Sequence, residues 1–86
     1  MKLKKQVKFL KPADFIIWYF DGLRPAAKAV GRSHSAVNKW RRARKEGGSD
    51  GYIPRVAMHR ILDLAEKNGW NIIPYDLIFG RTIIFK

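Results

Sequence analysis

A short polar and basic stretch, residues 34–45, holds the side chains best suited to chemistry in this chain of 86 residues. One group carries hydrogen-bonding atoms that match the edges of base pairs: Ser35, Asn38, Lys39, His34 and Arg42. A second group, in and just before the stretch, suits phosphate oxygens: Arg32, Ser33, Arg41, Arg44 and Lys45. Because residues 34–45 contain no acid, the pattern predicts a surface that recognises a nucleic-acid duplex.

Such a surface needs a scaffold that turns one side of a helix outward. The types and spacing of a helix-turn-helix are present in Ala27, Gly31, Val37 and Trp40. The alanine is small enough for two helices to touch, and the glycine tolerates a left-handed turn. The valine and tryptophan would fix the second helix to the core. Its outer face is then free to enter a major groove.

The ends of both helices can be placed from single residues. Pro25 suits the first position of a helix over residues 25–30, although Arg24 before it is a poor N-cap. The hydroxyl of Ser33 can cap a second helix over residues 34–44. The turn between the two helices then lies at residues 31–32.

The charge of the chain is uneven along its length. Residues 1–45 carry thirteen Lys or Arg and two acids, and residues 46–86 carry five of each, which gives a net charge of +11. Such an excess usually reflects a polyanionic partner, and a generic solubilising surface is the alternative. We expect residues 2–11 to form a basic arm on the DNA backbone or in a minor groove; a segment lying on an anionic membrane is the alternative.

The remaining pattern predicts one small, mainly α-helical domain spanning residues 1–86. The apolar run 15–20 could be a buried strand, but Asp21-Gly22 after it, a plausible left-handed stop, and the helical pattern that follows favour a helix. Residues 47–51 have the composition of a flexible loop.

Two further helices and an extended tail complete the predicted fold. A helix is expected over residues 54–67 and a fifth, short one from Pro74. Residues 81–86 favour an extended strand, which either packs on the body or pairs with the tail of a second copy and so forms a homodimer.

Catalytic chemistry is not indicated. The chain has no cysteine, and its two histidines lack the spacing of a metal site. Asp50, His59 and Asp63 could be grouped as a small nuclease site, but their spacing does not specify one. We therefore expect no catalytic residue, no metal, no cofactor and no small-molecule substrate. No apolar run is long enough for a membrane span, so no membrane partner is expected.

The combined motifs resemble those of small prophage regulators of the Cro and YdaS type, including the carph-isopro group. The likeness covers about residues 14–79 and is carried by Phe20-Asp21-Gly22, Val30-Gly31, Val37 to Trp40, Ile53-Pro54 and Ala65 to Gly69. It implies a λ-repressor-like bundle of about five short helices that binds double-stranded operator DNA as a dimer and regulates transcription. The implied setting is a bacterial cytoplasm or nucleoid, or a phage-infected host.

The residues alone leave two other functions open. A non-specific architectural protein, bound to DNA or RNA, would carry the same charge. An antitoxin-like interaction module would use its tail to bind a protein.

Overall fold

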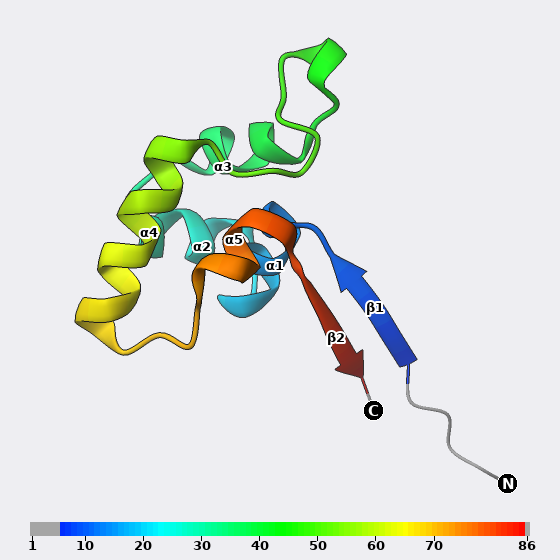
Figure 1. Cartoon of the computed structure of the whole chain (residues 1–86). Coiled ribbons are helices and arrows are strands. Elements are labelled where there is room, and N and C mark those ends of the chain that lie inside the picture. The colour runs from blue at the N-terminus through cyan, green and yellow to red at the C-terminus, as the bar shows by residue number, and fades with distance from the viewer. Residues whose placement is uncertain (1–5, 86) are drawn as a thin grey trace, which may run out of the picture.

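The computed structural model describes residues 6–85, which form five α-helices, one short 3-10 helix and a two-stranded sheet (Figure 1). In chain order these are β1 (Gln6–Leu10), α1 (Pro12–Tyr19), α2 (Leu23–Val30), α3 (His34–Arg41), η1 (Arg44–Glu46), α4 (Arg55–Asn68), α5 (Pro74–Phe79) and β2 (Arg81–Phe85). The predicted mainly α-helical fold with a short C-terminal strand is confirmed.

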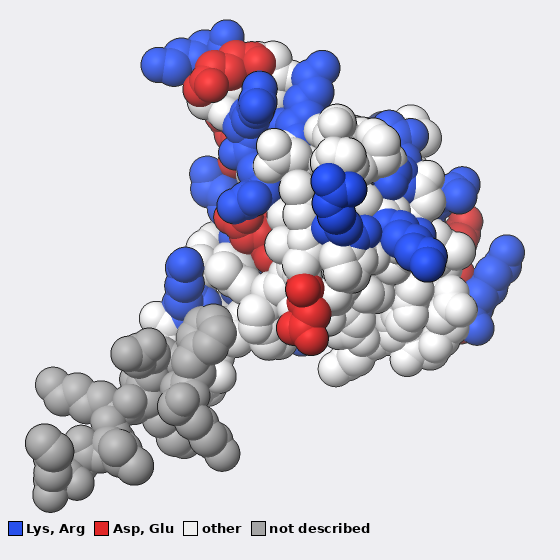
Figure 2. All heavy atoms as spheres, turned by 180° about the vertical axis from the view of Figure 1, so that it is seen from behind, with Lys and Arg blue, Asp and Glu red and all other residues white. Residues whose placement is uncertain are grey.

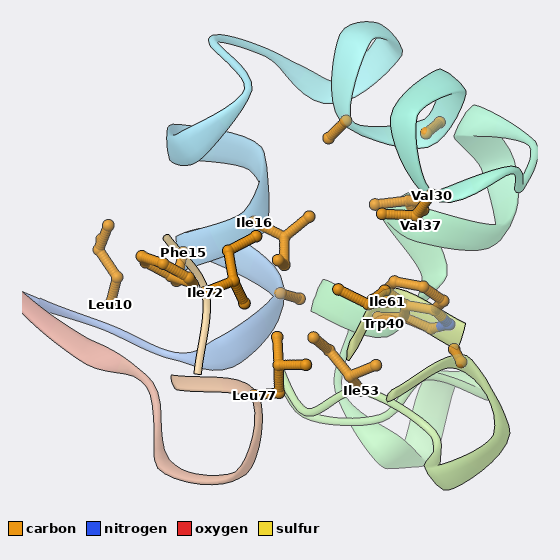
Figure 3. Packing of buried hydrophobic residues seen from close by; sticks show 14 of the residues in the cluster. Leu10, Phe15, Ile16, Val30, Val37, Trp40, Ile53, Ile61, Ile72 and Leu77 are labelled. Atoms are coloured by element: carbon orange, nitrogen blue, oxygen red, sulfur yellow. The ribbon is translucent and has the colours of Figure 1, made fainter. Parts of the chain in front are cut away.

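One apolar core joins all five α-helices. Its members have little or no exposed surface, and each α-helix supplies at least one, as with Phe15, Val30, Val37, Ile61 and Leu77. Figure 3 shows these side chains converging between the ribbons. A chain of this size has room for only one such core, so the helices must pack around it together.

The apolar run after Pro12 forms α1, as predicted, and not a strand. Phe15 and Ile16 are buried on its inner side, whereas Trp18 is exposed. The helix stops because the next turn is left-handed, with φ of 65° at Asp21 and 145° at Gly22.

α2 begins earlier than expected. Its first residue is Leu23 and its N-cap is Gly22, so Arg24 lies in the first turn and is not the cap. Pro25 is the third residue of the helix, where its missing N–H costs nothing because the first turn has no internal acceptor. The predicted start at residue 25 was therefore wrong by two residues.

The later helices lie close to their predicted places. α4 starts one residue late, because Pro54 is its N-cap, and it ends with a left-handed Gly69. α5 starts at Pro74 as expected.

β1 and β2 form an antiparallel ribbon that brings the two ends of the described chain together, from Gln6 opposite Phe85 to Leu10 opposite Arg81. The ribbon extends away from the helices (Figure 1). The prediction of a free basic arm is wrong for residues 6–10, which are a paired strand, and its first residues, 2–5, lie outside the described residues. The C-terminal tail pairs within its own chain.

A buried ion pair fixes this ribbon to the body. The Asp76 carboxylate, 3 % exposed, accepts from Nε of Arg81 at 3.0 Å and also from its Nη2. The same carboxylate accepts the Ile73 backbone N–H at 3.1 Å. The Arg81 guanidinium also lies 4.8 Å from the centroid of the Phe15 ring, so this one side chain joins β2 to both α5 and α1.

Arg81→Met should lower the free energy of unfolding by about 3 kcal/mol, because it leaves the Asp76 charge buried without its partner. Urea unfolding followed by circular dichroism measures the loss. The matched control is Arg41→Met, which breaks an ion pair more than 40 % exposed on both sides and should cost under about 1 kcal/mol. Equal losses for the two variants would contradict the anchoring role of Asp76.

Candidate nucleic-acid interface

α3 is held to the body by its apolar side. Val37 and Trp40 are buried in the core, as predicted. They pack in one cluster with Ala27 and Val30 of α2 and with Ile61 of α4 (Figure 3). This packing fixes the rotation of α3 about its own axis and so decides which residues face outward.

The turn between α2 and α3 has the geometry that the sequence predicts. Gly31 adopts φ 70° and ψ 32°, and the Arg32 N–H donates to the Ala27 carbonyl at 2.9 Å. The Ser33 hydroxyl then accepts the Ala36 N–H at 3.1 Å and caps α3. Two short helices are thus joined by one fixed turn.

Arg60 of α4 completes this turn, a role that sequence reasoning missed. Its Nε donates to the Val30 carbonyl at 3.1 Å, where it satisfies one of the last carbonyls of α2. A Cβ placed on Gly31 would lie 2.5 Å from its Nη2. Nothing in the sequence relates residue 60 to residue 31, because the contact exists only after α4 packs on α2.

The outward side of α3 carries the predicted base-contact residues. Ser35 precedes Asn38 and Lys39 by three and four residues, so these side chains share the side of α3 opposite its buried residues, and Arg42 lies just past the end of the helix. Asn38 is half-buried and the other three are exposed, as is His34 in the first turn. The structure therefore gathers three of the five on one face of α3, with His34 at its margin and Arg42 just beyond the C-terminal end of the helix.

α3 ends at Arg41, and the predicted extension to residue 44 is wrong. The carbonyls that would continue the helix are taken by the following loop. Gly51 N–H donates to the Trp40 carbonyl at 2.6 Å, and Asp50 N–H donates to the Arg42 carbonyl at 2.8 Å. Arg42 accordingly adopts an extended backbone, φ −73° and ψ 154°.

The loop after α3 projects from the body and carries Arg44 and Lys45, both exposed, on η1 (Figure 1). Asp50 organises it by accepting the Arg44 backbone N–H at 2.7 Å. Lys11, which the sequence assigned to the basic arm, donates to the Asp50 carbonyl at 3.0 Å. The glycine-rich segment is thus hydrogen-bonded on both sides and is not a plain flexible linker.

Acids partly offset two of the predicted phosphate-binding cations. Nε of Arg41 donates to Oδ1 of Asp14 on α1 at 2.9 Å. Nε of Arg44 lies 3.7 Å from Oδ2 of Asp50. Both pairs are solvent-exposed, so each contributes little to stability but lowers the local positive potential.

The remaining cations give the molecule one strongly positive region. Figure 2 shows Lys and Arg side chains over the upper half of this face, around the projecting loop and across to the opposite edge, with a few acids among them and a largely uncharged surface below. Exposed Arg32 lies before α3, and Lys45 lies after it. Positive charge therefore flanks both ends of the polar face.

Residues 6–85 were searched for a metal-binding cluster and for a membrane-spanning helix. Within that range no three His, Asp or Glu side chains gather closely enough to hold a metal ion. None of the helices in the same range combines the length and the apolar character that a membrane crossing requires. Comparisons with models of protein families, with curated proteins and with solved structures found no match for this chain.

Gly31→Ala should cost about 2 kcal/mol of folding free energy. About half comes from a left-handed backbone carrying a Cβ, and half from displacing Arg60 from the Val30 carbonyl. Gly69→Ala is the matched control, because Gly69 has nearly the same φ, 69°, but nothing within 4 Å of an added Cβ. The Gly69→Ala variant should lose only about 1 kcal/mol of folding free energy, as measured by thermal unfolding. Equal losses would show that the Arg60 contact adds nothing.

Proposed function

We propose that this protein is a transcription regulator that binds double-stranded DNA and reads its sequence with α3 in the major groove. The observation that carries the proposal is the two-sided character of α3. Val37 and Trp40 fix one side in the core, and the opposite side presents Ser35, Asn38 and Lys39 with no acid among them.

The dimensions of α3 suit this role. An α-helix with its side chains is about 10–12 Å across, which the roughly 12 Å wide major groove admits, and the eight residues of α3 extend about 12 Å along it. Asn38 has the donor and acceptor that pair with adenine, and Lys39 and Arg42 have the donors that pair with guanine. These side chains can therefore contact several neighbouring base pairs.

Phosphate contacts fall to the residues on either side of α3. Arg32 and the N-cap Ser33 precede it, and Arg44 and Lys45 follow on the projecting loop. Arg41 is the weakest member of this set, because its guanidinium already pairs with Asp14. Contacts of this kind set the position of the protein on the duplex but do not read sequence.

Selection of bound duplexes from a random pool tests the proposal directly. A regulator should enrich a consensus, palindromic if two copies bind together. Recovery of duplexes without a consensus, with steep salt dependence, would favour a non-specific architectural protein. Preference for RNA over duplex DNA would also contradict the proposal.

Asn38→Ala should weaken binding to the selected site by about 1–3 kcal/mol and reduce the preference over random duplex, because one bidentate base contact is lost. Fluorescence anisotropy on both duplexes measures the two affinities.

The comparison variant is Lys45→Ala, on the exposed loop. It should weaken both duplexes alike and reduce the salt slope by about one unit. Lys67→Ala, an exposed cation near the far end of α4, should change neither quantity. Asn38→Ala losses that are equal on both duplexes would reject the base-reading role.

A further inference from the structure

The projecting loop after α3, residues 42–51, has a defined shape although its sequence is rich in glycine (Figure 1). Its base is closed twice, because the backbone N–H groups of Asp50 and Gly51 donate to carbonyls at the end of α3 at 2.8 and 2.6 Å. A Cβ on Gly48 would collide with the Arg42 backbone carbonyl, so the two sides of the loop leave no room for a side chain there. The loop is therefore folded on itself.

One side chain, that of Asp50, organises the interior of the loop. Its Oδ1 accepts the Arg44 backbone N–H at 2.7 Å, which is the first N–H of η1 and has no acceptor within that helix. Asp50 holds this position in a left-handed conformation, φ 53°, which Asp and Asn adopt more readily than most other side chains. Its own carbonyl accepts from Nζ of Lys11 at 3.0 Å. Asp50 thus joins η1 and the base of the loop to the residue that precedes α1.

The charge of Asp50 opposes that of the loop around it. Residues 42–51 carry three cations and two acids, and Oδ2 of Asp50 lies 3.7 Å from Nε of Arg44. A carboxylate at this place lowers the attraction of the loop for a polyanion. Its hydrogen bond to the backbone acts in the other direction, because a loop that is already ordered loses less conformational entropy when it binds. Substitution separates the two effects, since an amide keeps the acceptor oxygen and loses the charge.

We propose that Asp50 is a positioning residue that holds the projecting loop in the shape in which Arg44 and Lys45 bind the phosphates of a duplex, a role that rests on the proposed function only for duplex binding and not for the reading of sequence. Both cations are exposed on η1. With η1 fixed by Asp50, they are presented to phosphates from one rigid turn, so binding needs little further ordering of the loop. The loop lies within the positive region of the molecule (Figure 2).

NMR relaxation of the backbone amides tests the order of the loop without DNA. The order parameters of residues 43–49 should be about 0.85 in the unchanged chain and in Asp50→Asn, because the amide oxygen still accepts the Arg44 N–H. In Asp50→Ala they should fall below about 0.6. Thermal unfolding of each variant checks that the helices are retained. Order parameters that stay high in Asp50→Ala, or that are already low in the unchanged chain, would overturn the positioning role.

Fluorescence anisotropy with a random duplex then measures what the order of the loop adds to binding. Asp50→Asn should bind about twofold to fivefold more tightly than the unchanged chain, because the charge beside Arg44 is lost and the shape is kept. Asp50→Ala loses the same charge and should still bind at least about tenfold more weakly than Asp50→Asn. The ratio between these two variants removes the effect of charge and leaves that of order.

Two further variants in the same loop separate shape from charge. Glu46→Ala removes the other acid, which is exposed on η1 and is not the acceptor of the Arg44 N–H. It should therefore strengthen binding, in the opposite direction to the same substitution at Asp50. Gly48→Ala changes no charge but forces the chain away from the Arg42 carbonyl, so it should weaken binding.

Equal affinities of Asp50→Asn and Asp50→Ala for the random duplex would overturn the positioning role, as would a Gly48→Ala variant that binds as tightly as the unchanged chain. A chain that binds no duplex would reject this role and the proposed function together. Selection of duplexes without a consensus has a different meaning. It would reject the reading of sequence by α3, while the affinities for random duplex would still decide the role of Asp50.

Discussion

Anchoring of α3 by Val37 and Trp40 is the constraint on which the rest of this structure depends. A helix of eight residues is marginal in water on its own, so its existence relies on tertiary packing. Trp40 also has a second role, because its backbone carbonyl accepts the Gly51 N–H and so holds the end of the projecting loop against α3. A single side chain and its backbone thus fix both the polar face of α3 and the basic loop beside it.

Three of the seven acids of this basic chain lie against particular cations. Asp14 pairs with Arg41, Asp50 lies beside Arg44, and Asp76 holds Arg81. The first two pairs lie within the positive region, where like charges crowd and each acid relieves local repulsion. Only Asp76 is buried, and there the pair has a structural role, because it joins strand to helix.

Local signals were enough to predict most of the helices. A left-handed glycine, a serine cap, and a valine and tryptophan at helical spacing are each readable over a few residues, which is why Gly31, Ser33 and the burial of Trp40 were anticipated. The start of α2 was misplaced by two residues on local signals, and the other predictions that failed depend on residues distant in sequence. α3 stops early because Asp50 and Gly51 take its carbonyls, a competition invisible in its own residues.

The N-terminal strand was missed for the same reason. Lysines alternating with apolar residues in positions 2–11 are typical of both a solvated arm and an exposed strand, and only the presence of β2 decides between them. Arg60 and the Asp76–Arg81 pair likewise gain their roles from packing that no short window contains.

The pairing of β1 with β2 has a consequence for how the molecule assembles. The two strands are the first and last elements of the described chain. Their pairing therefore closes a loop that contains all five α-helices. Contacts of such long sequence separation form slowly, because the closure entropy must be met before they stabilise anything. During synthesis the first strand leaves the ribosome long before its mate exists. It must wait unpaired, with Leu10 in water, until residues 81–85 emerge.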